Sequence, residues 1–190
     1  MTTPTPDVEH WSSFKVWLFS VFARNPKSNI TAVDSIAPGP DDHFLDLGCG
    51  LGAALERASA TGARVAGVDP SPAMVRRAVK RVPHAEVKPG SAEEIPFPDD
   101  TFTVVASISS YHHWTDPDAG LKETLRVCAP GGRLYIVERR LKRNSGHGLS
   151  DRGATDLSEK LLELGHASSS VDPLAVGQSR YLVVSGAAPQ

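Results

Sequence analysis

From residue 44 onward, short apolar runs alternate with longer segments in which apolar residues recur at helical spacing. The apolar runs have the length of buried strands, and the amphipathic segments are long enough to form helices. The pattern predicts strands at 44–47, 64–69, 85–88, 102–108 and 133–138, and helices at about 52–60, 71–81 and 117–128. Such alternation is typical of βαβ units, so we expect a parallel sheet with helices packed on its faces.

Two of these helices have clear start signals. Ser71-Pro72 and Asp116-Pro117 each place a capping residue before a proline, which suits the first turn of a helix. Each helix therefore begins just after the carboxyl end of a strand, at the edge where open α/β sheets bind their ligands.

The chain before residue 38 has a different pattern. An apolar stripe at helical spacing over Trp11–Phe22 predicts an amphipathic helix, and a second helical piece is expected at 30–36. A proline-rich turn at 37–40 separates these helices from the core. We expect a single domain in which residues 1–37 form a helical lid and residues 38–190 form the α/β core.

The chain after residue 138 continues the alternation. A helix is expected near 155–164, and two further strands are expected near 167–176 and 180–185. Too little chain remains for the separate substrate domain that a dehydrogenase would need.

Composition narrows the class of protein. With 190 residues, of which 40% are hydrophobic and 22% charged, the chain is long enough for one sizeable core, and a second domain is not expected. The formal net charge of −2 provides no overall attraction to nucleic acid, so we expect no nucleic-acid partner. The apolar stretch Trp11–Phe22 is too short for a membrane span, and residues 1–10 lack the features of a secretory signal.

The cysteines and histidines give no sign of a metal site. Cys49 and Cys128 are the two cysteines, which suits a reduced compartment, so we expect a cytoplasmic protein. His10, His147 and His166 show no ligand spacing, and no metal ion is expected.

The segment Phe44–Gly52 carries the strongest chemical signal, because it joins an apolar run, a carboxylate and three closely spaced glycines. This pattern predicts a strand followed by a turn in which the backbone passes close to a nucleotide-like ligand. Gly48 and Gly50, with Ala53 after them, also satisfy the dinucleotide-binding pattern. In either case an acidic residue after the second strand, about 20 residues on, would bind ribose hydroxyls, and Asp69 stands there.

The sign of charge separates the two cofactor classes. Asp46 lies just before the glycines, where a carboxylate would repel a pyrophosphate but would suit the ammonium group of a methionine moiety. We therefore expect S-adenosylmethionine rather than a dinucleotide.

Four motifs, taken in order along the chain, carry a family resemblance. The order Asp46-Leu-Gly-Cys-Gly, then 87–102 followed by Thr103-Val-Val-Ala, then Arg126-Val-Cys-Ala-Pro-Gly-Gly resembles class I S-adenosylmethionine-dependent methyltransferases. Within that family it looks like the ubiquinone/menaquinone (type 11) branch, over residues 44–138. The resemblance implies a Rossmann-like, doubly wound α/β sheet, mostly parallel, with an antiparallel last strand formed by the carboxyl-terminal tail.

The resemblance also implies roles for individual residues. Asp46 would meet the methionine ammonium group, Asp69 would accept the ribose hydroxyls, and Gly52 would allow close approach of a helix. At the adenine the family usually has Asp or Glu where this chain has Ser91, so a weaker hydrogen bond is expected unless Glu93 substitutes. The full predicted cofactor set is Asp46, Leu47, Gly48, Cys49, Gly50, Asp69, Pro70, Ser91, Ala92, Glu93 and Ser107.

The segment after the fourth strand, Ser107–Trp114, stands where methyltransferases present groups to the acceptor. It lacks the Asn/Asp-Pro-Pro-aromatic signature of enzymes that methylate DNA bases. His112 or His113 could serve as a general base for a hydroxyl or an acidic carbon. The alternative is that this pair packs the loop.

The sequence thus favours a methyltransferase with a small-molecule acceptor. Two alternatives remain: a methyltransferase-fold protein that binds cofactor or a partner without catalysis, and a peripheral membrane protein held by the stripe at Trp11–Phe22. Because no large inserted segment is available to cover the site, we expect the amino-terminal helices or a second subunit of a homodimer to cover it.

Overall fold

The computed structural model describes residues 27–142 and 147–190. The helix predicted at Trp11–Phe22, and with it most of the lid predicted at 1–37, lies outside these residues. Within the described part, no helix combines the length and the apolar character that a membrane crossing needs.

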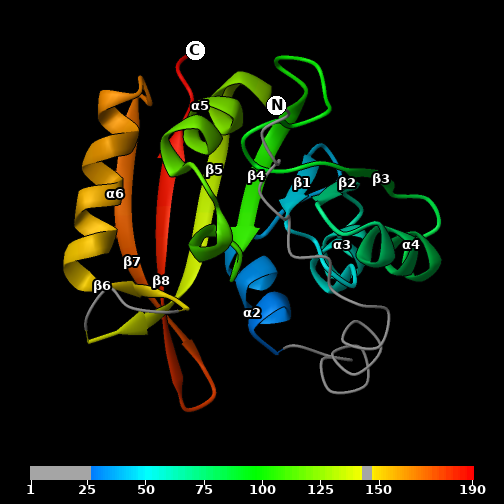
Figure 1. The fold of residues 1–190 in the computed structure, drawn as a ribbon, viewed down its shortest axis with the longest axis horizontal. Coiled ribbons are helices and arrows are strands. Elements are labelled where there is room, and N and C mark those ends of the chain that lie inside the picture. Colours follow the sequence, from blue (N-terminus) through cyan, green and yellow to red (C-terminus); the bar gives the residue numbers. More distant parts are fainter. Residues whose placement is uncertain (1–26, 143–146) are drawn as a thin grey trace, which may run out of the picture.

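The core is an eight-stranded sheet with the strand order β3-β2-β1-β4-β5-β8-β7, and the short β6 pairs with β5 (Figure 1). The five strands β1 to β5 run parallel to one another. Strand β8 is antiparallel to both of its neighbours, β5 and β7. The predicted fold, a mostly parallel sheet with an antiparallel last strand, is therefore confirmed. The strands are β1 (His43–Leu47), β2 (Arg64–Asp69), β3 (Glu86–Pro89), β4 (Phe102–Ile108), β5 (Cys128–Leu141), β6 (Leu149–Ser150), β7 (Ser168–Val176) and β8 (Ser179–Ala187).

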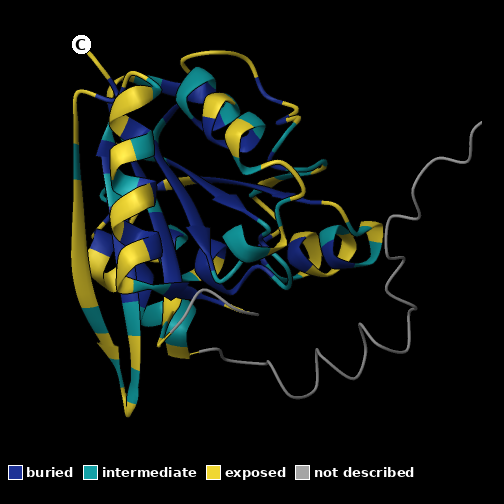
Figure 2. Cartoon of the chain, turned by 60° about the vertical axis from the view of Figure 1, so that its left-hand side comes forward, coloured by how far each residue is buried: buried dark blue, intermediate teal, exposed yellow. Residues whose placement is uncertain are grey.

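Helices cover both faces of the sheet, and the central strands are buried between them (Figure 2). One face packs against α2, α3 and α4 through small apolar side chains such as Ala54 and Ala78. The other face packs against α5 and α6, to which Leu121 and Leu161 belong. The helices are α2 (Lys27–Ile36), α3 (Ala53–Ser59), α4 (Pro72–Arg81), α5 (Pro117–Val127) and α6 (Asp151–Glu163), with a 3₁₀ turn η1 (Tyr111–His113) after β4.

Strand order reverses between β1 and β4. The chain leaves β1 toward β2 and β3, then returns to the other side of β1 as β4. At such a switch point the connections after neighbouring strands diverge, which opens a crevice at the carboxyl ends of the strands. The glycine turn follows β1 and the histidine pair follows β4, so both lie beside this switch point.

The last helix begins earlier than its apolar pattern indicates. Expected near 155, α6 starts at Asp151, because the Ser150 hydroxyl accepts a hydrogen bond of 3.1 Å from the Gly153 N–H and so caps the first turn. A glycine in that turn weakens the helical signal of the sequence.

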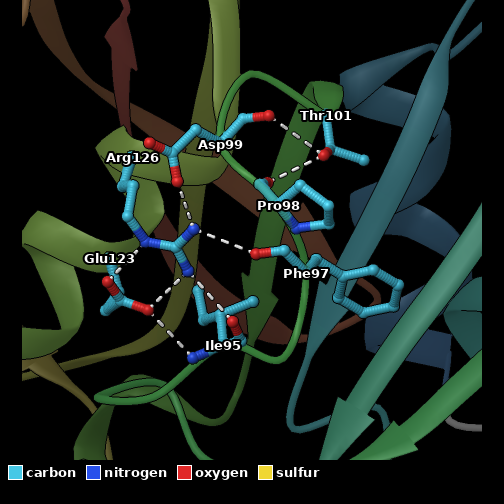
Figure 3. A network of polar contacts seen from close by, with 7 residues as sticks. All are labelled: Ile95, Phe97, Pro98, Asp99, Thr101, Glu123 and Arg126. Atoms are coloured by element: carbon cyan, nitrogen blue, oxygen red, sulfur yellow. Dashed lines mark hydrogen bonds and ion pairs between the residues drawn. The ribbon is translucent and has the colours of Figure 1, made fainter.

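The connection between β3 and β4 is tied to α5 by one arginine (Figure 3). The Arg126 guanidinium donates to the carbonyl oxygens of Phe97 and Ile95 at 2.9 and 3.0 Å, and it pairs with Asp99 and Glu123 at 2.7 Å. Glu123 in turn accepts from the Ile95 N–H at 3.0 Å. These bonds hold in place the segment that directly follows the predicted adenine-binding turn.

Candidate active site

The glycine turn after β1 is bonded to the end of β2. The N–H groups of Gly48 and Cys49 both donate to the Val68 carbonyl, at 2.8 and 3.0 Å, and the Gly50 N–H donates to Asp69 Oδ2 at 2.9 Å. The turn therefore places the carboxyl ends of two neighbouring strands in one rigid unit.

Two glycines of this turn are required by close contacts. Gly48 has φ +73°, and a Cβ at this position would overlap the Ser110 side chain, which comes from the loop after β4. Gly52 has φ +76°, and a Cβ there would lie 3.2 Å from the Ala78 Cα. Gly52 thus allows α3 to approach α4, as predicted.

Asp69 ends β2 with its carboxylate partly satisfied by backbone. Its Oδ1 accepts from the Ser71 N–H and its Oδ2 from the Gly50 N–H, both at 2.9 Å. Burial raises the pKa of Asp69, and these two N–H groups oppose that rise. Each oxygen keeps lone-pair capacity for a further donor, such as a hydroxyl group.

Asp46 lies beside Asp69 but has no comparable support. The residue is 1% exposed, and its Oδ2 has no hydrogen-bond partner among the residues that the structure describes. Burial, and then the charge of Asp69, raise the pKa of Asp46 to about 7. A buried carboxylate is costly unless a cation or a donor compensates it, so this position suits a ligand that supplies one.

The turn after β3 holds Ser91, Ala92 and Glu93. Glu93 Oε1 accepts from the N–H groups of Thr115 and Asp116, at 2.7 and 3.2 Å, just before α5. Burial alone would raise the pKa of Glu93, but hydrogen bonds from Ser91 and from these N–H groups hold it below its usual value. Sequence reasoning missed this contact, since nothing local links Glu93 to the start of α5.

Four other predicted cofactor residues differ in burial and in which of their groups are available to a ligand. The Leu47 side chain belongs to the core, so only its backbone is available to a ligand, whereas Pro70 is exposed. Burial raises the pKa of the Cys49 thiol well above its usual value, which agrees with an inert small residue. Ser107 is fully buried on β4, and its hydroxyl has no partner among the described residues.

The histidine pair lies in η1, just after β4, and His112 rests on a buried acid from β5. His112 Nδ1 lies 2.9 and 3.0 Å from the two carboxylate oxygens of Glu138, and the Glu138 side chain is fully buried. Burial raises the pKa of Glu138 to about 7, while N–H groups of Tyr111, His112 and Arg139 oppose that rise. Sequence reasoning did not single out Glu138, because its partner is contributed by another strand's loop.

Trp114 completes this loop by packing. Its ring lies against α5, where a Cβ on Gly120 would approach it to 2.5 Å, and Tyr111 contacts it at a ring-centroid distance of 5.0 Å. The aromatic part of the loop after β4 therefore anchors the turn that carries the histidines.

Comparison with known proteins agrees with this geometry. Residues 45–136 match the family described as the methyltransferase domain. Residues 45–136 therefore form a methyltransferase domain. The matched span runs from β1 to β5, and it includes Asp46, Asp69 and the histidine pair.

Curated relatives match the same region of this chain. It is 41% identical over 102 residues to the demethylmenaquinone methyltransferase of Chlorobaculum parvum, which is 53% of this chain and 42% of the relative. It is 38% identical over 102 residues to the 27-O-demethylrifamycin SV methyltransferase of Amycolatopsis mediterranei, covering 50% and 38%. The chain thus spans less than half the length of these relatives.

Solved structures share the fold of this chain over nearly its whole length. The putative methyltransferase of Haloferax volcanii, solved with the Trm112 methyltransferase activator, superposes with a TM-score of 0.78 at 20% identity and covers 95% of this chain and 96% of its own. A Thermotoga maritima methyltransferase superposes with a TM-score of 0.70 at 19% identity, over 93% and 95% of the two chains. At these identities the likeness concerns the fold.

Proposed function

We propose that this chain binds S-adenosylmethionine and transfers its methyl group to a small-molecule acceptor. The observation that carries the proposal is Asp46, a buried carboxylate with an unpartnered oxygen at the glycine turn. The α-ammonium group of the cofactor's methionine moiety is a cation that would compensate this charge. A dinucleotide would bring a pyrophosphate instead, which the same carboxylate would repel.

The residues around Asp46 suit the rest of this cofactor. Asp69 has both oxygens held by N–H groups and retains acceptor capacity for two ribose hydroxyls. The backbone of Gly48, Cys49 and Gly50 is available to line the methionine moiety. When bound, the cofactor supplies an activated methyl group, and the protein contributes alignment of the acceptor with that group.

The acceptor class is inferred from the relatives. Their names point to a demethylmenaquinone and to a demethylrifamycin, both small molecules, and no described feature suggests a polymer groove. Catalysis by His112 or His113 as a base stays a prediction, as do the cytoplasmic location and the homodimer. His112 has the geometry of an oriented base, since Glu138 binds its Nδ1.

A cofactor-binding protein without transferase activity is the alternative. The same fold, at a TM-score of 0.67 and 18% identity, is found in the [4+2]-cyclase SpnF. The fold alone therefore does not decide between methyl transfer and another use of the site.

Binding and turnover are tested separately. We expect calorimetry to show binding of S-adenosylmethionine and S-adenosylhomocysteine and no comparable binding of NAD. Asp69→Asn should weaken cofactor binding by roughly 5- to 150-fold, about 1–3 kcal/mol, because a charge-assisted acceptor is lost. Asp156→Asn, an exposed position on α6, is the matched control and should leave the affinity unchanged.

Mass spectrometry of extracts incubated with labelled cofactor should reveal a methylated product. Binding without any product would favour the non-catalytic alternative. Preference for NAD, or an unchanged affinity in Asp69→Asn, would refute the proposal.

A further inference from the structure

Three histidines from two parts of the chain meet at the carboxyl edge of the sheet. One nitrogen from each of His112, His113 and His147 lies within 4.8 Å of the other two. The ring centroids are 4.0 Å apart for His112 and His113, and 4.9 and 5.4 Å from these two rings to His147.

We propose that His112, His113 and His147 bind a divalent transition metal ion, with Zn²⁺ as the preferred probe, and that Glu138 orients His112 as a ligand. The proposal concerns a site beside the cofactor turn and does not depend on the proposed methyl transfer. It revises the sequence-based expectation that the protein has no metal site.

Glu138 provides the outer contact that a ligating imidazole usually has. Metal-bound histidines commonly donate their second ring N–H to a carboxylate, which sets the tautomer and directs the other nitrogen to the metal. Both Glu138 oxygens lie within 3.0 Å of His112 Nδ1, so the Nδ1–H donates to this acid and Nε2 keeps its lone pair. The backbone N–H of His112 also donates to Glu138 Oε1, at 3.3 Å, which fixes the acid in place.

Charge in this cluster also favours a metal ion. Neutral imidazole is the form that binds metals. A divalent cation would also balance the fully buried carboxylate of Glu138.

The third ligand is brought to the site by the backbone. A Cβ on Gly148 would overlap the Arg139 carbonyl oxygen, so the chain passes directly against β5 beside Glu138. Residue 149 then pairs with Arg140 as β6 begins. This contact places His147 opposite the η1 turn, which explains why sequence spacing did not reveal the cluster.

Closure onto a metal requires a small movement. Zn–N bonds of about 2.0–2.1 Å in a tetrahedral site place the ligand nitrogens roughly 3.4 Å apart, closer than the present spacing. His113 and His147 are exposed, so their rings can turn inward while His112 stays fixed by Glu138. Three protein nitrogens leave a fourth position open, as in catalytic zinc sites.

The fourth coordination position of the metal ion would lie near the expected cofactor. Ser110, immediately before η1, packs against Gly48 of the cofactor turn, so the cluster adjoins the expected position of the methionine moiety. A hydroxyl, enol or phenol oxygen of the acceptor is the ligand class that Zn²⁺ would take there. In that case His112 does not act as the base, because its Nε2 lone pair is used in coordination.

The first experiment uses the metal-free full-length chain and Zn²⁺ alone. Competition with a chromogenic chelator should show one tightly bound Zn²⁺ per chain, and Co²⁺ should give the absorption of a tetrahedral site. His147→Ala changes an exposed side chain and should weaken binding by 10-fold or more while the unfolding temperature of the metal-free protein is unchanged. His84→Ala is the control, since it removes an exposed histidine that contacts Ser59 rather than this cluster.

The second experiment tests the orienting role of Glu138. Glu138→Gln keeps the shape of the side chain but removes its charge, and it should weaken Zn²⁺ binding by about 10- to 100-fold. If this variant does not fold, the comparison of His147→Ala with His84→Ala decides alone. No specific uptake by the wild-type chain, or equal affinity in His147→Ala, would overturn the metal site. Calorimetry with S-adenosylmethionine on metal-free protein tests the proposed function independently.

Discussion

Asp46 and Asp69 are two carboxylates at the ends of neighbouring strands, and they differ in what compensates them. Asp69 is held by two backbone N–H groups, whereas Asp46 Oδ2 has no partner among the described residues. The difference predicts that Asp46 makes the free protein less stable when it ionises and that a cationic ligand relieves this cost.

The effect of Asp46 has a defined pH window. Its pKa is about 7 in the folded protein and near 3.8 in an unfolded chain, so the folded state holds the proton more tightly. The contribution of Asp46 protonation to the free energy of unfolding is therefore complete below pH 3.8 and is lost as the pH rises through 7. Asp46→Asn should therefore raise the free energy of unfolding at pH 8, by at most about 4 kcal/mol, and by much less at pH 5.

Urea unfolding of the cofactor-free protein at both pH values measures this effect. Asp156→Asn serves as the exposed control and should have the pH dependence of the wild type. If Asp46→Asn raises the free energy of unfolding no more at pH 8 than at pH 5, the prediction is wrong. The charge of Asp46 would then be compensated by groups other than the described residues.

Individual residues divide into those that local sequence predicts and those that it does not. Asp46, Gly48 and Asp69 follow from a strand, a turn and the next strand, so short spacing was enough to bring them together. Glu93 and Glu138 have partners in the loop after β4, far along the chain. Those contacts depend on strand order and on side-chain packing, which apolar periodicity does not encode.

At the scale of the elements, Arg126 binds the β3–β4 connection to α5. Replacing it with Ala would remove one donor from each of the Ile95 and Phe97 carbonyl groups and would break the ion pair with Glu123. We expect Arg126→Ala to lower the free energy of unfolding by about 2–3 kcal/mol and also to weaken cofactor binding, because the turn at Ser91 is released.

Arg126→Lys should restore little of this stability, since one ammonium group cannot reproduce the planar array of donors. Chemical denaturation measures the change, and Arg152→Ala, at an exposed position on α6, is the control. If Arg126→Ala lowers the free energy of unfolding no more than the control does, the hydrogen bonds of Arg126 contribute no net stability, because water replaces them.

Element boundaries were predicted well where the ladder is regular. The strand expected at 133–138 matches the part of β5 that pairs continuously with β4. The structure adds Cys128, which pairs with Phe102 before a shift in register. The residues between, Pro130-Gly131-Gly132, predict a turn, because proline and glycine usually interrupt strands. The pairing of Cys128 with Phe102 could therefore not be predicted from the sequence.

For the whole molecule, the lid predicted before the core can be tested by truncation. Residues 1–26 lie outside the described part, and α2 packs on the sheet through Ala32, Val33 and Ile36. A chain that begins at Lys27 should therefore keep the unfolding temperature of the full chain. If the removed segment closes the site, methyl transfer should fall on the order of 10-fold or more while cofactor affinity changes little.

The control for this truncation is the 190-residue chain with Trp11→Ser and Phe14→Ser, which interrupts the apolar stripe without shortening the chain. Both proteins should lose activity together. Equal turnover in the truncated and full chains would exclude a lid, and flotation of the full chain with vesicles would favour the membrane-associated alternative instead.

The two outer strands of the sheet bear on how the protein behaves at high concentration. Within the described residues β3 and β7 each have one neighbour, so their far sides could template pairing with another chain. Both are poor templates. β3 has four residues and ends in Pro89, and β7 carries Asp172 and Pro173 at its centre, in a largely exposed strand (Figure 2). Proline offers no N–H and a charge resists burial, so the architecture that opens a ligand crevice at its centre also resists edge-to-edge aggregation.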